Sequence, residues 1–204
     1  MTRSAPRAWR LAPLLIPMLI PVLIPLLAGC GTPLKENFYI LSASPMPAPA
    51  AGGLSYRVAV GPVTVPAAVD RPQIVLRVNT NRVALQEQSR WAEPLKESIP
   101  RVVASNLAAV LADAQVAADV QDAAVPADCR VTIDIQRFDS VLGEAATLEA
   151  LWRVNDTSGG GTIGRFLIRE PAGAQGFDAL AAAHSRALAA LSQDIAAAIR
   201  KSRP

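Results

Sequence analysis

Apolar and polar residues alternate along much of the chain, and this alternation predicts β-strands. Valines recur through residues 57–65 and are interrupted by Gly61-Pro62, where a bulge or a sheet edge is expected because proline cannot donate to a β-ladder. Residues 74–78 and 83–85 flank Asn79-Thr80-Asn81-Arg82, which predicts a hairpin with asparagines in its turn.

Three further strands are predicted on either side of a glycine-rich turn. Residues 131–136 and 148–154 are half-buried strands by their alternation, and we expect antiparallel neighbours joined through residues 139–146. Gly159-Gly160-Gly161 is a turn before a strand over 163–168, without the basic or hydroxyl residues of a phosphate loop. A short strand over 38–41 precedes all of these.

Two stretches have helical spacing. The first starts at Pro94 and runs to about Ala112, and Pro100 within it predicts either a later start or a kink. The second runs from Phe177 to Ile199 with one apolar stripe, and basic residues follow at its carboxyl end. Much of its remaining surface is alanine, which suits an ordinary surface helix or contact with a second element or subunit.

The first 29 residues have the organisation of a bacterial export signal. Arg3, Arg7 and Arg10 precede an uncharged stretch over residues 11–29, which is long enough for a transmembrane helix. Prolines at every fourth position disfavour a stable spanning helix, because each removes a backbone donor. We therefore expect a signal peptide over 1–29, although the length alone leaves the membrane helix open.

Leu27-Ala28-Gly29-Cys30 resembles a lipobox, in which small residues admit the peptidase and the cysteine thiol takes a diacylglycerol. The alternative is a chance cysteine after a leucine-rich run. Lipidation predicts that Cys30 becomes the first residue, carrying diacylglycerol and an N-acyl chain, which is enough for stable attachment. In the bacterial lipoproteins that this segment resembles, an aspartate after the cysteine favours retention in the inner membrane. Here the residue is Gly31, so the resemblance implies the periplasmic face of the outer membrane of a Gram-negative bacterium. Residues 30–54 then form a tether with the short strand and a Pro/Gly linker, and residues 55–204 the main domain.

Charge and composition argue against a polyanion-binding protein and against a disordered one. The chain has 20 Lys and Arg against 17 Asp and Glu, but three of the arginines lie in the first 29 residues, so the rest is neutral. A polyanion-binding role loses its support. With 51% apolar and 18% charged residues the chain is not a disordered protein, and 175 residues suffice for one domain.

The residues that could carry chemistry are few. His184 is the single histidine, has no nucleophile motif beside it and lies on the apolar stripe, where a packing role is the commoner outcome. Cys129 has no partner once Cys30 is lipidated, and it is either a buried thiol or a reactive one. No cluster has metal-ligand spacing. Scattered carboxylates could form an acid pair or a solvated strand face: Asp134, Asp139, Glu144 and Glu149. The pattern favours a binding or assembly module without a cofactor or catalytic residue.

Several short motifs, taken in order, are similar to the ABC-type transport auxiliary lipoproteins, the family of paraquat-inducible protein C (PqiC). They are residues 38–41, Val60-Gly61-Pro62-Val63 followed by Pro66, residues 70–75, residues 90–95, Trp152 and the alanine-rich terminal helix. Their order and spacing span nearly all of the mature chain. The long proline-patterned signal and Pro100 depart from the family pattern.

The resemblance implies a mixed α/β sandwich, with a mixed β-sheet packed against two long helices in one domain. It also implies the outer-membrane lipoprotein of an MCE-type lipid transport system, which forms a homo-oligomeric ring, docks a periplasm-spanning MCE protein and supports envelope integrity. The residues expected to contact a partner or another subunit are Arg71, Pro72, Trp91, Pro94 and His184. Trp91 is either core or an interface anchor. A monomeric ligand-binding lipoprotein, or an envelope enzyme using His184 or a carboxylate pair, remains the alternative.

Overall fold

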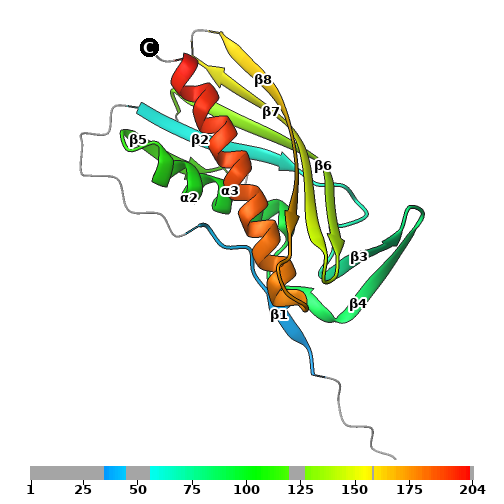
Figure 1. Ribbon diagram of the computed structural model, residues 1–204. Coiled ribbons are helices and arrows are strands. Elements are labelled where there is room, and N and C mark those ends of the chain that lie inside the picture. The colour runs from blue at the N-terminus through cyan, green and yellow to red at the C-terminus, as the bar shows by residue number, and fades with distance from the viewer. Residues whose placement is uncertain (1–34, 45–55, 120–126, 158, 203–204) are drawn as a thin grey trace, which may run out of the picture. The chain divides into compact units, whose positions relative to one another are not determined.

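Eight strands and two helices make up the part of the chain that the computed structural model describes, which is residues 35–44, 56–119, 127–157 and 159–202 (Figure 1). In order they are β1 (Asn37–Tyr39), β2 (Tyr56–Thr64), β3 (Gln73–Asn79), β4 (Arg82–Trp91), α2 (Leu95–Val110), β5 (Ala114–Ala118), β6 (Cys129–Val141), β7 (Ala145–Asp156), β8 (Gly161–Pro171) and α3 (Phe177–Ser202). The export signal and Cys30 fall outside the described residues, and of the tether predicted over 30–54 only residues 35–44 are described.

The sheet divides at the long strand β6. One edge of β6 bonds antiparallel to β7, which in turn bonds to β8. The other edge bonds in parallel to β2 through Cys129–Asp134, and further along to β3 through Ser140. β2 continues to β5, whereas β3 continues through β4 to β1. A single eight-stranded mixed sheet therefore has β8 at one side and both β5 and β1 at the other, which confirms the mixed α/β class.

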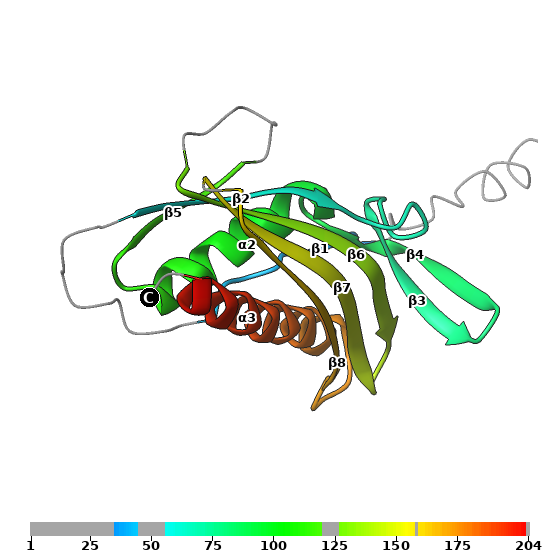
Figure 2. The ribbon, with the colours of Figure 1, turned by 90° about the horizontal axis from the view of Figure 1, so that it is seen from above.

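Both helices cover the same face of this sheet (Figure 2). α2 packs against β2 and β5, α3 packs against β7 and β8, and the helices contact each other between them. The alternation in β6 and β7 explains this arrangement, since Val131, Ile133 and Ile135 point to the helices and are buried. The core is the layer between the sheet and the two helices, as predicted for the sandwich.

The structure corrects several boundaries. β6 and β7 extend into the predicted connection over 139–146 and leave only a tight turn at residues 142–144, where Gly143 has a positive φ of 74°. Helix α2 starts at Leu95 and continues through Pro100 to Val110, so the later start is wrong. Strand β5 was not predicted, because its small residues give no clear alternation. β1 pairs with β4, so the folded unit begins at Glu36.

The predicted interruption at Gly61-Pro62 is confirmed as a bulge in β2. Its pairing with β6 shifts between Val60 and Val63, so the proline leaves the ladder at that point. Gly61 has φ 139°, and a Cβ there would lie 2.3 Å from the carbonyl oxygen of Asp119. Only glycine lets the backbone following β5 approach this closely.

Trp152 on β7 links the sheet to α3 by a side-chain hydrogen bond. The indole Nε1 donates a hydrogen bond to Asp194 Oδ2 at 2.9 Å, and the ring lies over the backbone of the neighbouring β8 residue Gly164. A Cβ on Gly164 would sit 2.1 Å from the indole. The aromatic residue and the glycine are thus a matched pair across two strands.

Candidate functional site

Four of the five predicted contact residues line one pocket. Arg71, Pro72, Trp91 and Pro94 surround a cavity of about 370 Å³, which also involves Asp70, Ala92, Glu93 and Lys96. Strand pairing produces this convergence, because β3 begins just after Pro72 and β4 ends at Trp91. The Trp91 backbone N–H donates to the Pro72 carbonyl at 2.7 Å. We call this cavity the hairpin-base pocket, since it lies where the β3–β4 hairpin joins the body and α2 begins.

Trp91 forms the inner wall of the hairpin-base pocket. The residue is only 7% exposed, so most of the indole belongs to the core. It meets Phe138 edge-on, with ring centroids 6.1 Å apart, and His184 edge-on at 6.0 Å. The residue is therefore mainly a packing residue, and its remaining surface lines the pocket.

His184 supports Trp91 from behind and cannot itself touch a partner. It has no exposed surface, it stacks on Phe138 at 3.9 Å, and its Nε2 lies 2.8 Å from Ser140 Oγ. Burial lowers the pKa of the imidazole to about 3, although the nearby Asp139 carboxylate opposes the shift. The prediction that His184 directly contacts a partner or another subunit is wrong for this structure. The side chain is enclosed in the core, and it is neutral at physiological pH.

The rim of the hairpin-base pocket has one unpaired cation. Asp70 and Lys96 form an ion pair across the rim at 3.3 Å, and Glu93 is paired with Arg101 on α2. Within the described ranges, the guanidinium of Arg71 has no hydrogen bond or ion pair. A partner's carboxylate could bind there without breaking an internal pair.

An ion-pair cluster ties the hairpin to the sheet near this pocket. Arg77 on β3 donates to Asp139 Oδ1 on β6 at 2.9 Å, and Arg137 donates to Oδ2 at 2.7 Å. Burial alone would raise the pKa of Asp139, but the hydrogen bonds and charges of the two arginines outweigh it, so the pKa lies below its ordinary value. Beyond this tie the hairpin extends from the body (Figures 1 and 2) and exposes Val78, Val83 and Leu85.

The other carboxylates considered as a possible acid pair each bind different partners. Asp134 accepts hydrogen bonds from Thr64 and Gln136, Glu144 pairs with Arg169, and Glu149 pairs with Arg165. Cys129 is buried in β6. The described residues contain no group of three His, Cys, Asp or Glu side chains placed to hold a metal ion. Nor does any helix in these same ranges have the length and apolar character needed to cross a membrane.

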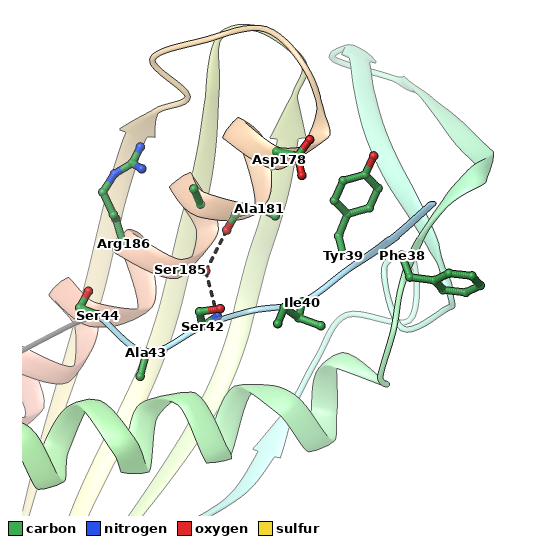
Figure 3. Close-up of a pocket in the computed structure, with 11 residues that line it drawn as sticks. Phe38, Tyr39, Ile40, Ser42, Ala43, Ser44, Asp178, Ala181, Ser185 and Arg186 are labelled. Atoms are coloured by element: carbon green, nitrogen blue, oxygen red, sulfur yellow. Dashed lines mark hydrogen bonds between the residues drawn. The ribbon is translucent and has the colours of Figure 1, made fainter. Parts of the chain in front are cut away.

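A second cavity runs along residues 38–44, and no motif in the sequence predicts it. A groove of about 410 Å³ lies between residues 38–44 and α3 (Figure 3). The Ser42 N–H donates to Ser185 Oγ at 3.1 Å, and that hydroxyl donates to the Ala181 carbonyl at 2.9 Å. Further along, the Ser44 N–H donates to Asn106 Oδ1 on α2. These bonds hold the segment against both helices.

Comparison with known proteins agrees with the resemblance found in the sequence. A family model described as the ABC-type transport auxiliary lipoprotein component matches residues 39–196. No curated protein matches the chain. A crystal structure of an uncharacterised protein superposes with a TM-score of 0.67 at 18% identity, covering 81% of this chain and 99% of the other. A crystal structure of a DUF330 protein from Xanthomonas campestris gives 0.64 at 20% identity, covering 79% and 93%. At these identities the two structures support the fold.

Proposed function

Since the chain belongs to the ABC-type transport auxiliary lipoprotein family, we propose that it is the non-catalytic outer-membrane lipoprotein of an MCE-type lipid transport system. In this role it docks a periplasm-spanning MCE protein and supports envelope integrity. The observation that carries the proposal is the convergence of residues 70–72 and 91–94, both parts of family-like motifs, on one pocket.

The chemistry of the hairpin-base pocket suits a protein partner. Trp91, Pro72 and Pro94 provide rigid apolar surface, which is typical of sites that bind an extended peptide or anchor one large side chain. Arg71 adds an unpaired charge at the rim. The adjoining hairpin, with its exposed apolar residues, can lie along a partner that occupies the pocket. These features support docking of a segment with an apolar anchor next to an acidic residue.

A homo-oligomeric ring belongs to the same proposal. Strand β8 has a free edge along 11 residues, because its pairing within the described sheet is to β7. Long free edges are sites where a further chain can add. A head-to-tail contact that uses β8 on one copy and a different surface on the next would close into a ring if its rotation allows.

Photocrosslinking in cells tests the docking role. A benzoylphenylalanine at Ala92 in the hairpin-base pocket should crosslink to an MCE-domain protein, whereas the same group at the exposed Ala197 on α3 should not. Charge reversal by Arg71→Glu should weaken the crosslink. The matched control is Arg153→Glu, because Arg153 is also exposed and, among the described residues, has no side-chain ion pair.

The result that would refute docking is equal crosslinking from both positions, or none to an MCE-domain protein. Membrane fractionation tests location independently, since the proposal expects the lipidated protein in the outer-membrane fraction. The size of the purified lipidated protein in detergent tests the ring, and a monomer would remove that part of the proposal.

A further inference from the structure

Two large apolar side chains are exposed in β1 and directly after it, and β1 is the strand nearest the predicted lipid anchor. Phe38 is 60% exposed and Ile40 is 62% exposed, although most large apolar residues in the part of the chain that the structure describes are in the core. Tyr39 lies between them and points inward, with its ring 5.7 Å from that of Phe177. Figure 3 shows Tyr39 directed toward the start of α3 and Phe38 directed away from it. Successive residues of extended backbone face opposite sides, so Phe38 in β1 and Ile40 directly after it share the outward side, where they also form the outer rim of the groove beside α3.

The local fold fixes this exposure. β1 pairs in parallel with the end of β4, with Tyr39 opposite Trp91, and the Ala92 N–H donates to the Tyr39 carbonyl at 2.9 Å. The ion pair of Glu36 with Arg90, at 3.2 Å, holds the start of the strand. Turning Phe38 and Ile40 inward would require a one-residue shift that expels Tyr39 from its contact with Phe177. The two apolar residues are thus held outward by the pairing.

The short segment between Cys30 and β1 indicates that a lipid surface can cover Phe38 and Ile40. Seven residues separate Cys30 from Phe38, and the eight residue-to-residue steps between them span at most about 29 Å when the chain is extended. A lipid-anchored Cys30 therefore keeps Phe38 close to the membrane surface at all times. Short tethers give effective concentrations of the order of millimolar, at which a weak contact is populated. Fully burying one large apolar side chain shifts an equilibrium about tenfold or more.

Charge near the strand does not oppose an anionic lipid surface. Glu36 is neutralised by Arg90, and the preceding Lys35 adds positive charge. The other pair of equally exposed apolar residues lies on β8, where Ile163 is 63% and Leu167 is 57% exposed. β8 is at the opposite end of the pairing path β1-β4-β3-β6-β7-β8, with four strands between it and β1. The pair on β8 lacks the nearby anchor.

We propose that Phe38 and Ile40 form a membrane-contact patch that seats the β1 edge of the domain on the lipid surface to which Cys30 is attached. The inference rests on the lipid-anchor part of the proposed function. It adds an orientation to the anchor, because the β1 edge faces the bilayer and the β8 edge is held away from it.

Depth-dependent quenching on the acylated, full-length mature protein tests the patch. Single cysteines at 38, 40, 163 or 167 are labelled with the environment-sensitive dye NBD; the native Cys129 is buried at 3% exposure and is protected in the folded protein. The labelled proteins are reconstituted into vesicles of phosphatidylethanolamine and phosphatidylglycerol with spin-labelled lipid. We expect several-fold stronger quenching and blue-shifted emission at 38 and 40 than at 163 and 167.

The controls separate the patch from the anchor. Equal quenching at all four positions on vesicle-bound protein would overturn the patch and leave the anchor intact. Blue-shifted emission at 38 and 40 without lipid quenching would also overturn it, since a protein surface would then cover them. If Cys30→Ser leaves vesicle binding unchanged, the lipoprotein assignment itself fails. Quenching confined to 38 and 40, and lost with Cys30→Ser, supports the patch.

Discussion

The buried imidazole of His184 predicts a specific loss of stability in mild acid. In the unfolded chain the group titrates near 6.5, whereas in the folded protein burial lowers its pKa to about 3. Between these two pKa values the imidazole is protonated in the unfolded state and neutral in the folded state. The folded pKa is depressed, so the stabilisation is complete above about pH 6.5 and is lost as the pH falls toward 3.

The size of this loss in folding free energy depends on how far the pH lies below the pKa of the histidine in the unfolded chain. At about pH 4.5, two pH units below that value, the unfolded state gains about 2.7 kcal/mol relative to the folded state. The result is insensitive to the folded pKa, which is not reached at that pH. Asp139, whose pKa is also lowered, contributes mainly at lower pH, because its ordinary value is 3.8. Between about pH 7.5 and 4.5 the expected loss therefore comes from His184 rather than from Asp139.

Urea unfolding of a soluble form that begins after Cys30, followed by tryptophan fluorescence, measures this loss. His184→Gln removes the titrating group, so the variant should lose about 2.7 kcal/mol less than the wild type across the window. Ser140→Ala keeps the histidine and removes its hydrogen bond; it should cost about 1 kcal/mol at every pH and leave the pH dependence unchanged. An unchanged pH dependence in His184→Gln would refute the reasoning.

Three further predictions concern the packing that positions the site. Gly164→Ala should cost several kcal/mol, measured as a lowered Tm, because its Cβ would overlap the indole of Trp152; a Tm within a degree of the wild type would show that the ring can move aside. Trp152→Phe removes the donor to Asp194 and should cost roughly 2 kcal/mol in urea unfolding, and Asp194→Asn should cost less because it retains an acceptor. Arg77→Ala should accelerate amide hydrogen exchange in residues 74–86 while leaving β7 unaffected; equal acceleration in both would mean that the Asp139 contact supports the whole sheet rather than the hairpin.

Periodicity predicted the elements whose faces differ in burial. β6 and β7 alternate cleanly because one face meets the helices and the other meets solvent, and both were predicted, although their ends were not. β5 was missed because its pairing with β2 depends on backbone geometry, with alanines that carry little pattern. Pro100 predicts either a later helix start or a kink, and the later start is wrong, because packing of α2 against β2 and β5 outweighs the missing donor.

The sequence predicted four of the residues that line the hairpin-base pocket, but it did not predict that they form one cavity. Arg71 and Trp91 are 20 residues apart in sequence, and they meet because β3 and β4 pair between them. His184 was placed on the apolar stripe, but its stacking on Phe138 behind Trp91 depends on how α3 lies over the sheet. The exposure of Phe38 and Ile40 could not be read from a short apolar run, since that pattern fits a buried strand equally well.

The membrane-contact patch and the hairpin-base pocket share one structural element. Tyr39 pairs with Trp91 between adjacent strands, so the outward residues of β1 lie about 5 Å in the pairing direction from the strand that forms the pocket wall. If β1 rests on the lipid surface, the pocket opens near that surface, and a partner docked there ends close to the bilayer. A conduit that delivers lipid needs its terminus at this position. Folding of β1 onto β4 would then set both the orientation of the domain and the place where the partner binds.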